Sequence, residues 1–67
     1  MATQEDFDNI AATISYHVVG SYRRPPVAQE QRDVLCHLAS NIAEFWEIQH
    51  PRIFDNDYFM KNTGCLD

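Results

Sequence analysis

The chain has 67 residues, 45% hydrophobic and 22% charged, which allows one small domain over residues 1–67 and excludes a disordered tail. Ten acidic residues against five basic ones give a formal net charge of −5, which repels nucleic-acid phosphates and disfavours a nucleic-acid partner. No segment approaches the roughly 20 consecutive apolar residues of a membrane helix, and the acidic N-terminus differs from a signal peptide, so we expect a soluble, cytoplasmic protein without membrane contact.

The first predicted element is a helix over residues 4–19. Thr3 and Asp6 have the spacing of a capping box. Apolar side chains then recur at the three- and four-residue intervals of one helical face; they are Phe7, Ile10, Ala11, Ile14 and Val18. Gly20 occupies a position where helices commonly end.

The second predicted element is a long helix over residues 26–49, between Pro26 and the His50-Pro51 pair. It carries two apolar strips. The larger strip is expected to face the core and consists of Val27, Val34, Leu35, Leu38, Ile42 and Phe45. The smaller strip consists of Cys36, Ala39, Ala43 and Trp46. Together they cover about 200° of the helix at about 100° per residue, more than one short neighbouring helix buries.

A third, short helix is predicted over residues 56–63, with Asp55 as its N-cap and Gly64 at its end. Phe54 and Phe59 have the spacing of a hydrophobic staple. The predicted fold class is therefore all-α, a small three-helix domain whose long central helix is packed by the first helix and by the short C-terminal helix. The expected core consists of Phe7, Ile10, Ile14, Val18, Leu35, Leu38, Ile42, Phe45 and Phe59. Replacing Leu38 with Ala is expected to cost about 2–5 kcal/mol.

The small-residue strip of the second helix is the predicted partner-binding surface, formed by Cys36, Ala39, Ala43 and Trp46. The third helix, about 12 Å long, is expected to cover about a third of a helix about 36 Å long. Small residues on the remainder let another helix approach closely, and domains of this size commonly need additional stabilisation. We expect a homodimer or another protein to bind there. The alternative is that the first and third helices cover the strip and the alanines serve helix propensity alone.

The sequence shows no catalytic or metal-binding pattern. Cys36 and His37 are adjacent and point about 100° apart on a helix, so they neither share a metal ion nor form a nucleophile–base pair. Cys36 and Cys65 form one bridge if the compartment is oxidising, whereas a cytosol favours free thiols. We expect no enzymatic activity, no cofactor and no metal site.

The segment between the first two helices holds two of the five basic residues. Tyr22, Arg23 and Arg24 form a candidate anion-binding loop for a phosphate, a stacked base or an acidic protein. The alternative is that the arginines pair with Glu5, with Glu30 or with the carbonyl groups at the end of the first helix.

Residues 48–65 read IQHPRIFDNDYFMKNTGC and follow an alanine-containing amphipathic helix. This ending resembles that of small uncharacterised helical proteins of phages and bacterial mobile elements, which close with Asn-Pro, Phe-Asp, a short aromatic helix and a Cys-Gly end. Here His50-Pro51 stands in place of Asn-Pro, and Gly64-Cys65 reverses the final pair. The resemblance implies a phage or mobile-element context, and hence the cytoplasm of a host cell, and it assigns no site residue.

We therefore expect a non-enzymatic protein-interaction module, a phage-type accessory protein that binds and modulates a host protein whose identity the sequence does not give. The alternative is a small nucleic-acid-binding or regulatory module that uses the Tyr22-Arg23-Arg24 loop. Salt dependence separates the two hypotheses, because phosphate binding weakens steeply as salt rises and apolar contacts respond little.

Overall fold

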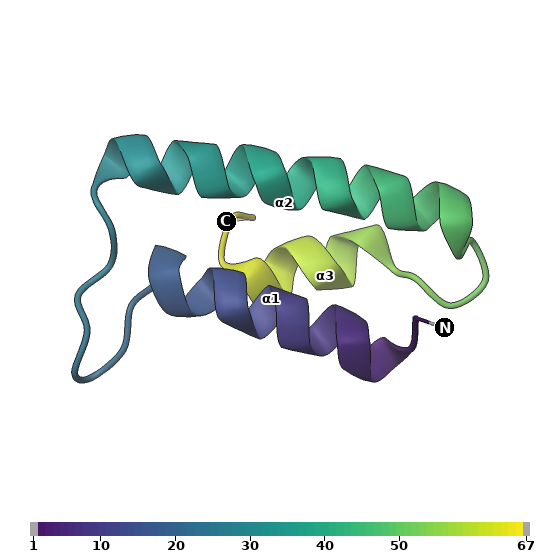
Figure 1. Ribbon diagram of the computed structural model, residues 1–67, viewed down its shortest axis with the longest axis horizontal. Helices are drawn as coiled ribbons and strands as arrows, with labels where there is room; N and C mark the ends of the chain where they lie inside the picture. Colours follow the sequence, from purple (N-terminus) through teal and green to yellow (C-terminus); the bar gives the residue numbers. More distant parts are fainter. Residues whose placement is uncertain (1, 67) are drawn as a thin grey trace.

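The computed structural model describes residues 2–66 and contains three helices (Figure 1). They are α1 (Gln4–Val18), α2 (Gln29–Gln49) and α3 (Asn56–Thr63). α1 and α2 run in opposite directions, and α3 folds back alongside both. The predicted all-α, three-helix fold is confirmed, and residues 2–66 contain no strand beyond an isolated bridge in the first loop.

The starts of α1 and α2 give one confirmed prediction and one correction. The Asp6 N–H donates to Thr3 Oγ1 (3.4 Å) and the Asp6 carboxylate accepts from the Thr3 N–H (2.9 Å), which is the predicted capping box. α2 begins at Gln29, three residues later than predicted. The Val27 N–H instead donates to the His17 carbonyl near the end of α1 (3.0 Å). Because that hydrogen bond satisfies the end of α1, the chain before α2 stays extended.

Both predicted ends of α3 are confirmed. Asp55 Oδ1 accepts a hydrogen bond from the Tyr58 N–H (3.1 Å), and Gly64 ends the helix in the left-handed region with φ of +78°. Phe54 and Phe59 are both buried, with ring centroids 5.4 Å apart. This contact is the predicted staple, and it turns α3 back onto the two longer helices.

The core is aromatic at one end and composed of small residues in its middle. The ring centroid of Phe7 lies 4.7 Å from that of Trp46 and 4.9 Å from that of Phe54. Ala39 and Ala43 of α2 are buried next to this cluster, where their short side chains permit close approach of the neighbouring helices. The buried hydrophobic residues are Phe7, Ala11, Ile14, Val18, Ala39, Ala43, Phe54 and Phe59.

The predicted core is correct only in part. Phe7, Ile14, Val18 and Phe59 are buried as predicted. Leu35 and Ile42 are half-buried, and Ile10, Leu38 and Phe45 are exposed. The reason is that α3 packs on the small-residue strip of α2, which leaves the larger strip facing α1 and solvent. Because Leu38 is 50% exposed, the expected loss of about 2–5 kcal/mol for Leu38→Ala is too large.

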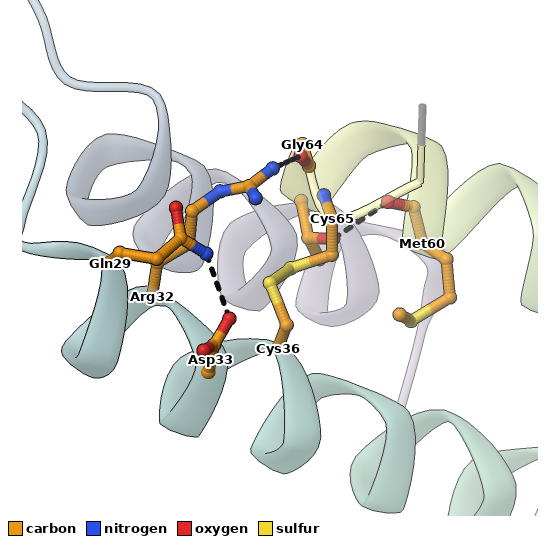
Figure 2. The surroundings of a disulfide bond; sticks show 8 residues. Gln29, Arg32, Asp33, Cys36, Met60, Gly64 and Cys65 are labelled. Carbon is orange, nitrogen blue, oxygen red and sulfur yellow. Dashed lines mark hydrogen bonds between the residues drawn. A yellow bond between two sulfur atoms is a disulfide. The ribbon is translucent and has the colours of Figure 1, made fainter.

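A disulfide between Cys36 of α2 and Cys65 fastens the end of the chain, with 5.6 Å between the two Cα atoms (Figure 2). Arg32 Nη2 donates to the Gly64 carbonyl beside it (3.3 Å). The buried Thr63 hydroxyl donates to a carbonyl one turn earlier (2.6 Å) and accepts from the Cys65 N–H (3.2 Å). The sequence allowed either a disulfide or two free thiols, and the structure has the disulfide. A disulfide is at odds with the free thiols expected of a cytosolic protein.

Candidate functional site

The predicted partner-binding strip of α2 lies inside the domain. Ala39 and Ala43 are buried, and Cys36 is part of the disulfide. Trp46 is half-buried, with its ring against Phe7. α3 was expected to be too short to cover this strip, but α1, α3 and the disulfide that follows α3 cover it together. The strip is therefore an internal packing surface, and the prediction that it binds a partner is corrected.

The larger apolar strip of α2 is the surface left uncovered. Its exposed members are Val34 at 67%, Leu38 at 50%, Phe45 at 58% and Ile48 at 72%. Leu35 and Ile42 are half-buried and form the edge toward α1. We call these six residues the α2 face. Contiguous exposed apolar surface of this kind is typical of interaction sites.

A groove of about 240 Å³ lies between the α2 face and α1. It is lined by Ile10, Thr13, Ile14, His17, Leu35, Leu38 and Ile42. None of these residues belongs to α3, and the α1 surface that α3 borders is a different one, where Asn62 lies beside Asp8 and Tyr16. The groove therefore extends the α2 face onto α1 on a side that α3 does not cover.

Three of the four acidic residues of α2 lie away from the α2 face. At about 100° per residue, Asp33, Glu44 and Glu47 lie roughly 110–170° from its midline. The fourth, Glu30, lies at the N-terminal end of the face, one turn before Val34, and the other polar residues beside the face are neutral: Gln31, Asn41 and Gln49. A chain with a net charge of −5 thus has an apolar surface on its longest helix whose neighbouring negative charge is confined to Glu30 at one end.

The predicted anion-binding loop is a tight turn. Ser21 and Arg24 exchange two backbone hydrogen bonds, of 2.7 Å and 3.2 Å. Tyr22 is fully exposed and Arg23 is exposed. The Arg24 guanidinium lies over the Tyr16 ring of α1, 5.3 Å from its centroid, in a cation–π contact that the sequence did not predict. The loop therefore presents Tyr22 and Arg23 outward while Arg24 is held against the domain.

Among residues 2–66, no three His, Cys, Asp or Glu side chains are grouped as ligands for a metal ion. The helices of the described chain are also too short or too polar to cross a bilayer. Fold and surface together define a small helical domain with an exposed apolar face on α2. Comparison with protein-family models, curated proteins and solved structures finds no match.

Sequence reasoning placed five of the six residues of the α2 face on one strip and assigned four of them to the core. The sequence does contain a feature that indicates which strip is buried: one strip of the second helix has large side chains and the other has small ones. Helices approach most closely where side chains are small, so a short neighbour such as α3 packs on Ala39 and Ala43. Ile48, a further exposed member, lay outside both predicted strips.

Proposed function

We propose that this protein is a non-enzymatic protein-interaction module that binds through the α2 face and the adjoining groove. The observation that carries the proposal is the exposure of Val34, Leu38, Phe45 and Ile48 along one side of a 21-residue helix. Exposed large apolar side chains cost solubility unless a contact covers them, and binding energy at interfaces concentrates in such residues.

The phage or mobile-element context implied by the C-terminal resemblance gives this proposal a direction. A module encoded by a mobile element acts on proteins of its host, and a compact helical domain with one apolar face is suited to occlude a surface of a host protein. We therefore propose host modulation by steric binding, in the host cytoplasm. That compartment is reducing, so the proposal places the protein where a bond such as Cys36–Cys65 is uncommon.

The test uses Leu38→Glu, which places a carboxylate in the α2 face, and Ser40→Glu as the matched control, since Ser40 is exposed near Asp33 and Glu44 on the acidic side of α2. Proteins captured from host lysate are purified and titrated with each variant by calorimetry. The proposal expects the purified partner to bind the wild type and Ser40→Glu with equal affinity. It expects the affinity for Leu38→Glu to be at least about tenfold lower, because an unpaired carboxylate is costly to bury. Equal binding of all three proteins would contradict it.

The Tyr22-Arg23-Arg24 loop supports a second candidate, a nucleic-acid-binding or regulatory module, because Tyr22 is fully exposed beside the exposed Arg23. If the loop binds phosphate, affinity for single-stranded oligonucleotides falls steeply as salt rises and is lost in Arg23→Ala. Fluorescence anisotropy at two salt concentrations measures this. Binding that is absent, or that persists in Arg23→Ala, removes the loop as a functional site.

A further inference from the structure

We propose that the occupant of the α2 face is a second copy of this chain, in an antiparallel isologous dimer whose two α2 helices pair about a two-fold axis beside residues 40 and 41. The inference rests on the proposed function, because it concerns the same surface: the second copy covers the α2 face of the free protein, and a host protein competes with that copy for it. It differs from the dimer that the sequence suggested, which used the small-residue strip now seen to be buried.

A row of residues along the middle of the α2 face, extended by one glutamine at each end, has the spacing typical of paired helices. We call this row the seam. Successive intervals of four, three, four, three and four residues join Gln31, Leu35, Leu38, Ile42, Phe45 and Gln49. This alternation repeats every seven residues, the period that keeps one seam facing a partner helix. The seam is apolar in its interior and ends in a glutamine on each side.

The seam is also symmetric under reversal of the helix, which is what an antiparallel two-fold pair requires. Reversal about residue 40 places Leu38 opposite the partner's Ile42, and Leu35 opposite the partner's Phe45. Each apolar position therefore meets an apolar position. The two terminal glutamines meet one another in the same register.

The residues on the outer flank of the seam pair about the neighbouring position, residue 41, because flanking side chains contact one another one residue away from the central layer. Val34 comes beside the partner's Ile48, so the two most exposed members of the α2 face are covered together. Asn41, which is exposed, comes beside its own copy at the two-fold axis, where two side-chain amides are able to hydrogen-bond to each other. The antiparallel arrangement also sets the positive end of each helix dipole beside the negative end of the other.

Charge does not oppose the pairing of two copies through the α2 face. Two chains of net charge −5 repel one another over most of their surface. The α2 face is the exception, because Asp33, Glu44 and Glu47 lie on the far side of the helix and remain in solvent when the face is covered. Glu30 lies beside the face at its N-terminal end, and the antiparallel arrangement puts the two copies of Glu30 at opposite ends of the pair, so the repulsion is small.

The available area predicts a weak dimer. Covering the α2 face and its neutral border in both copies removes on the order of 1,000 Å² of accessible surface, at the lower limit of specific interfaces. We therefore expect a dissociation constant in the micromolar range, about 1–100 µM. The partner helix would also contact Ile10 and His17 of α1, which line the groove.

The test is sedimentation equilibrium of the full chain from about 1 µM to about 500 µM. Wild type and Ser40→Glu are expected to pass from monomer to dimer together, and Leu38→Glu to remain monomeric throughout. Ile48→Glu, at a more exposed position, gives the same result without risk to the fold. Circular dichroism confirms that each variant is helical. A wild type that is monomeric throughout, or a dimer that survives both Leu38→Glu and Ile48→Glu, overturns the inference.

Orientation is tested by cross-linking. Under mild oxidation Asn41→Cys is expected to form a covalent dimer, and Ser40→Cys, on the other side of α2, is not. Equal cross-linking of the two variants overturns the antiparallel pairing. The dimer and the proposed function can fail independently. If the wild type is monomeric but Leu38→Glu weakens binding of a host protein, only the dimer is refuted. If the wild type is monomeric and Leu38→Glu leaves binding of a host protein unchanged, both are refuted.

Discussion

Replacing Ala39 with Leu is expected to destabilise the domain strongly. Ala39 has no exposed surface, so the three added carbon atoms must displace the residues packed on this side of α2. Overpacking of this kind costs about 1–3 kcal/mol. A domain of this length has a total stability of about 3–10 kcal/mol, so the substitution removes a large share of it.

The expected effect is a fall in melting temperature of about 4–24 °C, from about 4–8 °C per kcal/mol for a small domain. Circular dichroism of thermal unfolding, at a low fixed protein concentration, measures it. Ser40→Leu is the control, because it introduces the same side chain at the next position, which is exposed, and surface changes stay within about 0.5 kcal/mol. If Ala39→Leu melts at or above the wild-type temperature while Ser40→Leu is destabilised, the packing assigned to the two sides of α2 is wrong.

Three further predictions concern the ends of the short helix. Cys65→Ser, which opens a disulfide spanning 29 positions, is expected to lower the free energy of unfolding by roughly 2–4 kcal/mol; urea unfolding measures this, and unchanged stability would mean that the bond contributes nothing. Asp55→Ala is expected to cost about 0.5–2 kcal/mol, because it removes the acceptor for the Tyr58 N–H, and an unaltered melting temperature would show that the cap is dispensable. Gly64→Ala is expected to cost about 1 kcal/mol or more, because Gly64 has positive φ and an added Cβ would lie 2.5 Å from Val19 Cγ2; a stabilised variant would contradict this geometry.

The short helix α3 was predicted residue for residue because its determinants are local. Asp55, the Phe54–Phe59 spacing and Gly64 lie within eleven consecutive positions, and each acts on its immediate neighbours. The start of α2 was missed because it depends on the hydrogen bond from Val27 to His17, which joins two elements and leaves no local pattern.

The candidate site was harder to predict than the helices because the core side of α2 is a tertiary choice. Both strips of this helix are apolar, and periodicity alone ranks the one with larger side chains first. The preference of α3 for Ala39 and Ala43 depends on packing across the chain, and so does the pairing of Cys36 with Cys65. The residues of the α2 face were thus visible in the sequence while their exposure was not.

The most direct test of the uncovered α2 face is methyl NMR of the dilute protein with a soluble paramagnetic probe, which broadens signals from exposed groups. The structure predicts strong broadening of the methyl signals of Val34, Leu38 and Ile48, with those of Ala39 and Ala43 unaffected. The opposite pattern, with broadened alanine methyl signals and unaffected Leu38 signals, would contradict the claim that the α2 face is exposed and that Ala39 and Ala43 are buried.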